Sequence, residues 1–287
     1  MTHSRGAALI LVLMVTGILG LLMLSIGLTS RGYVDQARAL QERAEATLVL
    51  RSRESAVIYT LLTSQWIPDP QERAVHPYLS RWNFRGDPFE VDGARFRLQD
   101  EAGLFALPQP GQRLEEFSYL LQEIGLPAEK AAAATLQFKQ LLEPNGADKR
   151  AWTPVQSFGE LRSALGLPDA AFERLEQVAT LYPVQLFNPI TAPPEVLAVR
   201  YRGVSRDAVL DLRARGELSL KSLYDLTGEG ISDFTTAYPG AALRLEIAVK
   251  VGSVALRRES RWVIEPYADL PVRLTETRDR NGAEGAR

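Results

Sequence analysis

The chain has 287 residues, 46% of them hydrophobic, which is enough for one or two domains with sizeable cores. Its formal net charge of −2 gives no overall positive field, so nucleic-acid binding would need a locally basic patch. The sequence has no cysteine and only two histidines, which excludes a disulfide scaffold, a thiol nucleophile and a metal site built from several histidines.

The N-terminal segment joins a short basic leader to a long apolar run. Residues 1–6 are polar, whereas residues 7–28 contain no charged side chain. As a helix rising about 1.5 Å per residue, this run spans roughly 33 Å and is long enough to cross a membrane. Residues 29–66 follow without proline and are rich in helix-forming residues. We therefore predict one continuous helix, with its first half in a membrane and its second half in solvent.

Two general interpretations of this segment stay open. A cleaved secretory signal has an apolar core of roughly 7–15 residues and an A-x-A-like exit, which this longer core matches poorly. A plain signal anchor is the second interpretation. The count of positive charges does not support an inward N-terminus, because Arg5 precedes the span while Arg31, Arg38 and Arg43 follow it.

The junction between leader and apolar run favours a third interpretation. Gly6 ends the leader and Ala7 begins the run, which resembles the leader of type IV prepilins. A membrane prepilin peptidase cuts those leaders after the glycine, so the resemblance implies a mature, N-methylated chain that starts at Ala7 and keeps its helix. Ordinary pilins and major pseudopilins have Glu at the fifth mature position, where this chain has Leu11. Because a buried carboxylate needs a partner, the apolar residue suits a subunit at a filament tip, with no subunit ahead of it.

An apolar stripe continues along the second half of the helix, with members three or four residues apart. The stripe needs a partner, which is either a sheet of the same chain or the helices of neighbouring subunits, and both partners fit at different depths. The positions predicted to contact partner helices are Val34, Ala37, Leu40, Ala44 and Leu48.

Two hairpins are predicted far apart in the sequence. In the first, apolar and polar residues alternate on both sides of Asp92-Gly93, a favoured pair for a tight turn. In the second, residues 243–264 alternate around a turn at Gly252-Ser253, and Arg258 and Ser260 interrupt the apolar face of the return strand. The two hairpins predict one four-stranded antiparallel sheet packed on the long helix.

These elements define the predicted domains. Residues 67–102 and 241–274 form the domain that contains the sheet, and residues 103–240 form an all-α domain inserted between its strands. The charged segment 275–287 is predicted to be disordered. The predicted fold class is therefore α+β, with a long N-terminal helix on a small antiparallel sheet and a large helical insert.

A repeated phrase indicates how the insert is built. A helix ends at a glycine, an apolar residue follows, and Pro or Ser opens the next helix, which is the expected punctuation of helix–hairpin–helix units. The phrase occurs around Gly125, Gly166 and Gly203, with a degenerate copy at Gly230.

The sequence offers little catalytic chemistry, since it contains no G-x-S-x-G, Walker or H-E-x-x-H motif, and we predict that it is not an enzyme. Asp100 and Glu101 follow a strand and are expected to be solvated charges. The acidic residues around the glycine-containing turn near 230 miss the spacing of a Ca²⁺-binding loop, so no metal ligands are assigned. These acidic residues are Asp225, Glu229 and Asp233.

A local group of arginines raises the alternative of a DNA-binding module. Helix–hairpin–helix units bind phosphate through hairpin N–H groups, which favours a second glycine that these phrases lack. The arginines are therefore expected to pair with Asp207, Asp211 and Glu217, and no nucleic-acid partner is predicted. The group comprises Arg200, Arg202, Arg206, Arg213 and Arg215.

Taken together, the chain resembles the K-type minor pseudopilins of bacterial type II secretion systems. Besides the leader and the insert, the resemblance rests on D-E-A-G-L-F-A-L at residues 100–107 and F-N-P-I-T-A-P-P-E-V-L at 187–197. The chain departs from the family's phrases at Leu104, Ala106 and Ile190. It also has FKQLLEPNGAD at 138–148 in place of an acidic W-I-D-x-D phrase.

The resemblance implies a non-enzymatic subunit that is anchored by a single span in the bacterial inner membrane, with its head in the periplasm. It implies a tip complex with I-type and J-type minor pseudopilins, processing by the prepilin peptidase and no small-molecule substrate. Some family members bind calcium in the pilin-like part. A minor type IV pilin-like protein and a membrane-anchored DNA-uptake protein remain the alternatives.

Overall fold

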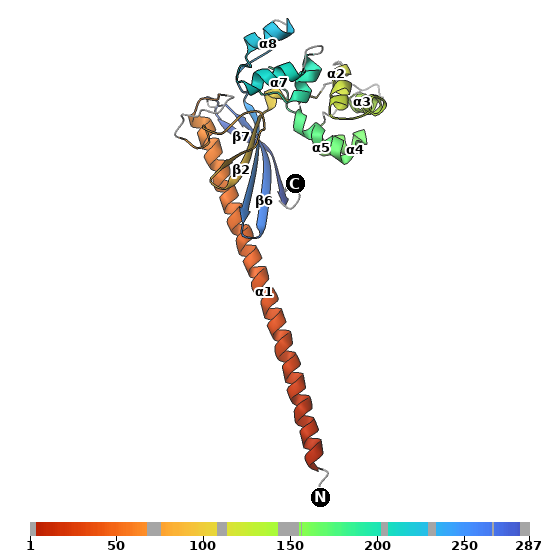
Figure 1. The fold of residues 1–287 in the computed structure, drawn as a ribbon, viewed down its shortest axis with the longest axis vertical. Helices are drawn as coiled ribbons and strands as arrows, with labels where there is room; N and C mark the ends of the chain where they lie inside the picture. The colour runs from red at the N-terminus through yellow and green to blue at the C-terminus, as the bar shows by residue number, and fades with distance from the viewer. Residues whose placement is uncertain are drawn as a thin grey trace.

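The computed structural model describes residues 4–67, 76–107, 114–142, 155, 157–201, 206–228, 234–265 and 267–281, and the side chains of these residues except 4–10, 206, 280 and 281. Helix α1 runs unbroken from Ser4 to Thr63 and is the long shaft in Figure 1. The stretch Leu11–Thr63 contains a window with a mean hydropathy of 2.5, long and apolar enough to cross a membrane. The predicted continuous helix is therefore confirmed, and it ends slightly before the predicted residue 66.

A five-stranded antiparallel sheet packs against the second half of α1 (Figure 1). Both predicted hairpins are confirmed. Asp92 and Gly93 have positive φ of 49° and 74°, as a tight turn between twisted strands requires, and Gly252 has a φ of 56°. The strands are β1 (Phe89–Val91), β2 (Ala94–Asp100), β5 (Ala242–Val251), β6 (Val254–Ile264) and β7 (Val272–Asn281), in the order β1-β2-β5-β6-β7.

The prediction that 275–287 is disordered is wrong for residues 275–281, which belong to β7. The sheet therefore has five strands and extends beyond the predicted boundary at 274. The charges that suggested disorder are paired across strands: Asp279 lies 2.6 Å from Arg258, and Glu276 lies 2.9 Å from Arg261. Cross-strand pairs of opposite charge stabilise such a strand without an apolar face. Residues 282–287 lie outside the described residues.

A compact apolar core fills the space between α1 and the sheet. Ala46, Leu50, Val57 and Leu61 are buried at spacings of four and seven residues, so they share one face of the helix. The sheet meets them with alternate residues, because successive side chains of a strand point to opposite faces. Its fully buried contributors include Trp82, Phe84, Phe96, Leu98, Leu245 and Ile247.

Arg258 and Ser260, which interrupt the apolar face of β6, contact Glu54 on α1. Glu54 accepts a hydrogen bond from the Ser260 hydroxyl at 2.7 Å and lies 3.2 Å from the Arg258 guanidinium. The side chains of Glu54 and Arg258 are only 13% and 14% exposed. This largely buried pair favours one register between helix and sheet, since a one-turn slip would leave the Glu54 carboxylate without its partners.

The segment between β2 and β5 forms a second body with its own apolar core, which lies at the end of the sheet far from the N-terminus (Figure 1). Gly125 and Gly166 have φ of 100° and 56° and end their helices as predicted. The phrases at Gly203 and Gly230 lie outside the described residues. The helices are α2 (Glu115–Glu123), α3 (Ala128–Leu142), α4 (Phe158–Leu165), α5 (Asp169–Val178), α6 (Pro194–Arg200), α7 (Arg206–Ala214) and α8 (Leu220–Thr227).

The tip of the β5–β6 hairpin is tied to α1 by one carboxylate. Glu42 accepts hydrogen bonds from the Ser253 amide at 2.9 Å and from its hydroxyl at 2.7 Å. A carbon added at Gly252 would lie 2.5 Å from the Glu42 carboxyl carbon, so glycine also permits the approach.

This contact predicts a pH effect. The hydrogen bonds from the side chain and backbone of Ser253 lower the pKa of Glu42 below its usual 4.5. The contact therefore adds stability above that pH and loses it as pH falls through the lowered pKa. We expect the Glu42 carboxyl to titrate below 4.5 by NMR, and Ser253→Ala to move the midpoint back towards 4.5. An unchanged midpoint in the variant would contradict the contact.

Candidate functional site

The predicted partner-helix stripe is exposed in the single chain. Val34, Leu40 and Leu48 are 66%, 63% and 68% exposed, and Ala37 and Ala44 are also exposed. The sheet covers a different face of α1, so the alternative that the chain's own sheet covers this stripe is wrong. The stripe remains available to other helices, and its role as a partner interface remains a prediction.

The processing residues lie at the far end of the same helix. Gly6 and Ala7 are within α1, and their side chains lie outside the described part. Leu11 is 66% exposed in the apolar run. Neither the cleavage after Gly6 nor the tip-specifying role of Leu11 is tested by this geometry, so both remain predictions.

The two phrases behind the family resemblance meet at the buried side chain of Asp100. Its Oδ2 accepts hydrogen bonds from Asn188 Nδ2 and Thr191 Oγ1, both at 2.9 Å. Its Oδ1 accepts from the backbone amides of Ala102 at 2.9 Å and Gly240 at 3.0 Å. The carboxylate thus ties together the chain where it enters the helical body, where it passes through residues 188–191 and where it returns to β5.

Close packing of backbone supports this junction. A carbon added at Gly103 would lie 2.6 Å from Thr191 Oγ1, 2.7 Å from the Thr191 carbonyl carbon and 2.8 Å from the Ala192 amide nitrogen. Two of these atoms belong to the backbone, so they cannot rotate away. Glycine is therefore required where the first phrase crosses the second.

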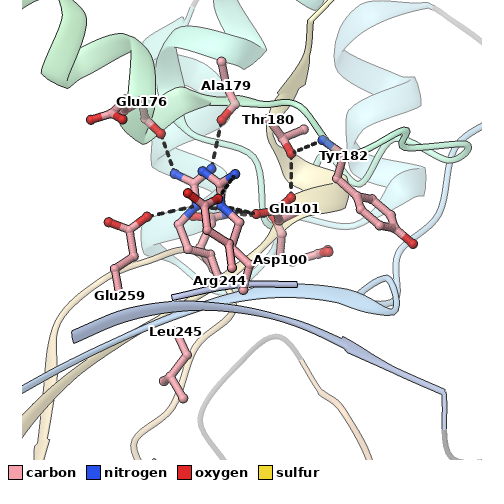
Figure 2. Close-up of polar contacts among 12 residues, drawn as sticks. Asp100, Glu101, Glu176, Ala179, Thr180, Tyr182, Arg244, Leu245 and Glu259 are labelled. Atoms are coloured by element: carbon pink, nitrogen blue, oxygen red, sulfur yellow. Dashed lines mark hydrogen bonds and ion pairs between the residues drawn. The ribbon is translucent and has the colours of Figure 1, made fainter. Parts of the chain in front are cut away.

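Glu101 lies with Arg244 on the side of the sheet opposite Leu245 (Figure 2), and Leu245 belongs to the core that contains the buried residues of α1. Glu101 Oε2 accepts a hydrogen bond from the Thr180 hydroxyl at 2.5 Å. Its Oε1 lies 3.5 Å from Arg244 Nε and 3.4 Å from Arg261 Nε. A 1% exposed carboxylate is thus balanced by two guanidinium groups on adjacent strands.

The two arginines extend the junction into the helical body. Arg244 donates to the carbonyl oxygens of Glu176 and of Ala179, the latter at 2.9 Å (Figure 2). Arg261 lies 5.2 Å above the centre of the Phe158 ring, a cation–π contact. Ala179 belongs to β4 (Ala179–Thr180), which pairs in parallel with β3 (Phe105–Ala106).

Burial is the largest cause of the pKa shifts of Asp100 and Arg261. Burial raises the pKa of Asp100, although its four hydrogen bonds act in the opposite direction. Burial and then the positive charge of Arg244 lower the pKa of Arg261, while Glu101 and Glu276 oppose them. Low dielectric strengthens each contact in the network and makes the loss of one partner costly.

The expectation that Asp100 and Glu101 are solvated is wrong, because they are 0% and 1% exposed. Their partners Thr180, Arg244 and Arg261 were not identified from the sequence. One signal was present: Arg244 and Arg261 occupy the polar positions of alternating strands, which can face a second layer as well as solvent.

The polar groups at the junction are bound mainly by other groups of the chain. The Asp100 carboxylate accepts four hydrogen bonds from the protein, and Glu101 Oε2 accepts one, whereas Glu101 Oε1 faces two guanidinium groups without a hydrogen bond. Among the described residues, no group of three or more His, Cys, Asp or Glu side chains could hold a metal ion. Of the three acidic residues near 230, only Asp225 is described, since Glu229 and Asp233 lie outside that part.

The described arginines of the basic group are used within the fold. Arg213 donates to the Ala192 carbonyl at 2.7 Å, Arg200 lies 3.7 Å from Glu116, and Arg215 lies 2.8 Å from Glu217. The expected pairing was therefore correct for Glu217. Arg202 and the side chain of Arg206 lie outside the described part.

Comparison with known proteins gives a likeness in fold. No protein-family model matches the sequence, and no curated protein is significantly similar to it. A chain in the crystal structure of the GspK-GspI-GspJ complex from the enterotoxigenic Escherichia coli type 2 secretion system is similar in fold, with a TM-score of 0.56 and 17% identity. The alignment covers 86% of this chain and 99% of that chain.

The chain has a pseudopilin-like fold. The likeness at 17% identity concerns the fold alone. It agrees with the predicted α+β class, in which a long N-terminal helix packs on an antiparallel sheet that carries additional helices. Within this fold, the junction at Asp100 and Glu101 joins the sheet to the helical body.

Proposed function

We propose that this chain is a K-type minor pseudopilin that caps the pseudopilus of a type II secretion system and supports protein export across the outer membrane. In this role it is a structural subunit. The mature N-terminus is Ala7, produced by the prepilin peptidase and methylated, and residues 7–28 anchor the chain in the inner membrane. The head stands in the periplasm, and its partners are I-type and J-type minor pseudopilins.

The extent of the structural likeness is the observation that carries this proposal. The 86% coverage of this chain is more than α1 and the five strands contribute, so the aligned part includes helices of the inserted body. The family resemblance at residues 100–107 and 187–197 points the same way, because both phrases meet at the base of that body. A large helical insert within a pilin sheet is the feature peculiar to the K-type.

The shape of the molecule supports a position at the tip. The inserted body lies at the end of the sheet away from the N-terminus of α1 (Figure 1). In a filament whose subunits pack by their N-terminal helices, this is the side on which the next subunit would be placed. Within the shaft, a large head would therefore occupy the space that the subunit ahead needs. At the tip no subunit lies ahead, so the head has room.

The surface of α1 supports helix-mediated assembly. Exposed apolar residues lie on the face turned away from the sheet, including Val34, Leu40 and Leu48. A contiguous apolar stripe outside the membrane span is typical of an interaction surface. Leu11 needs no amine from a subunit ahead of it, whereas a carboxylate at that position would.

Association and location test the proposal. We expect the mature full-length protein, coexpressed in membranes with the I-type and J-type minor pseudopilins of its own system, to copurify with both. We expect Leu40→Glu with Leu48→Glu to reduce copurification by about tenfold or more, because each buried carboxylate lacks a partner. Glu45→Gln on the same helix is the control.

Gold labelling of the head supplies the second readout. We expect label at one end of each pseudopilus. Label spaced along the shaft would refute the tip position, and copurification that is unaffected by the double substitution would refute the helix stripe as the interface.

A further inference from the structure

A cleft of about 1000 Å³ separates the outer face of the sheet from the helical body. Its floor is formed by β2, β5 and β6, and its wall by the end of α2 and one side of α5. It lies beside the junction at Glu101 and does not include the partner-helix stripe on α1. Neither the proposed function nor the folding of the chain requires this cleft to be occupied.

Most arginines on this face of the sheet are neutralised by carboxylates. Arg257 lies 2.5 Å from Glu246, Arg261 lies 2.9 Å from Glu276, and Arg278 lies 2.8 Å from Glu176. Arg244 lies 3.5 Å from Glu101. The face is therefore a lattice of ion pairs over β5, β6 and β7.

Strand β2 is different, because two of its arginines have no such partner. The side chains of Arg95 and Arg97 line the cleft, and neither forms a hydrogen bond or ion pair with any residue in the described part of the chain. Arg95 is exposed and Arg97 is half-buried. Glu90 lies opposite Arg95 in the β1–β2 pairing but forms no ion pair with it. A partly desolvated guanidinium gains most from an added carboxylate.

The wall carries two carboxylates in the same unsatisfied state, beside Arg174, which donates to the Ile124 carbonyl oxygen at 3.1 Å. Glu123 at the end of α2 and Glu173 on α5 line the cleft and are exposed. Neither side chain accepts a hydrogen bond or forms an ion pair in the described part of the chain. The cleft thus holds two arginines without an ion pair on its floor and two glutamates without an ion pair on its wall, and no ion pair joins the two sets in the described part of the chain.

We propose that this cleft binds an extended segment of a partner protein in which acidic and basic residues alternate. Arg95 and Arg97 lie two residues apart on one strand, so their spacing is about 6.7 Å along the strand. An extended segment repeats its side chains at the same distance, with neighbours pointing to opposite sides. Its acidic residues meet the floor, and its basic residues meet Glu123 and Glu173 on the wall.

Two peptides of equal composition test the sequence pattern. Fluorescein-labelled Glu-Lys-Glu-Lys-Glu-Lys and Glu-Glu-Glu-Lys-Lys-Lys are titrated against the full-length protein in detergent at low ionic strength. We expect the alternating peptide to bind about tenfold more tightly, since only it separates its charges onto two sides. We also expect its affinity to fall as salt is added.

Charge reversal tests the site. We expect Arg95→Glu with Arg97→Glu to weaken the alternating peptide about tenfold. Adding Glu123→Arg and Glu173→Arg to this double variant exchanges the charges of floor and wall. We expect the quadruple variant to bind the alternating peptide again, because the peptide can rotate about its long axis and present its basic side to the floor. Arg43→Glu with Arg51→Glu on α1 is the matched control and should bind like the unmodified protein.

The urea unfolding midpoint of each variant is measured to check that it folds. If the charge-reversed floor variant does not fold, Arg97→Gln replaces it, and we expect Arg97→Gln to weaken binding of the alternating peptide about threefold. Equal affinity for both peptides, unchanged affinity after the charge reversal of the floor, or no binding of either peptide would overturn the proposal. Failure of the tip assignment would leave it intact, because the cleft and the stripe on α1 are separate surfaces.

Discussion

Replacement of Asp100 by alanine is expected to lower the free energy of unfolding by about 3 kcal/mol or more, because three buried donors and one part-buried donor lose their acceptor. Two of these donors are backbone amides, at Ala102 and Gly240, and cannot turn towards another partner. The effect is measured by urea unfolding of the full-length protein in detergent, followed through tryptophan fluorescence, to which the buried Trp82 contributes.

Two further variants make this result specific. Glu265→Ala removes an exposed carboxylate that pairs with Arg273 at 3.0 Å, and it should cost less than about 1 kcal/mol. Asp100→Asn keeps the size of the side chain but adds a donor where donors already converge. Its loss in free energy of unfolding should therefore lie between those of the other two variants. A midpoint for Asp100→Ala that matches the unmodified protein would show that the junction does not hold the helical body on the sheet.

Replacement of Gly6 by leucine is expected to abolish processing of the N-terminus. The prepilin-like junction proposed here needs a residue without a side chain next to the cut, so that the peptidase can approach the backbone. Mass spectrometry of the unmodified protein, expressed with a prepilin peptidase, should show a chain that starts at Ala7. The Gly6→Leu protein should retain residues 1–6.

A control inside the same helix separates cleavage from membrane insertion. A carbon added at Gly20 meets no other atom within 4 Å, so Gly20→Leu should be inserted and cut normally. An intact Met1 in the unmodified protein despite active peptidase, or a cut near Ser30, would refute the prepilin interpretation in favour of a plain anchor or a secretory signal.

Local patterns predicted the regular elements well. The uninterrupted helix formers predicted α1, Asp92-Gly93 and Gly252-Ser253 predicted the two tight turns, and Gly125 and Gly166 predicted helix ends. Each of these features depends on residues that are neighbours in the chain. The strand β7 was missed, because its stability depends on ion pairs with β6 that alternation of apolar residues does not reveal.

The partners of the polar residues could not be predicted in the same way. Asp100 and Glu101 form an acidic pair after a strand, a pattern that is usually solvated. Their donors come from residues as far along the chain as Thr180, Asn188 and Gly240. Such contacts arise only when the helical body folds back on the sheet.

By itself, the sequence determined the long helix with its apolar run, the two hairpins and the placement of a helical body between them. These follow from periodicity and turn chemistry, which act over a few residues. Only the tertiary structure decided which face of α1 meets the sheet. It also decided that Asp100 and Glu101 are buried where the sheet meets the helical body, and that the charged C-terminal segment forms a fifth strand. The physical reason is that burial and ion pairing are properties of surfaces brought together from distant segments.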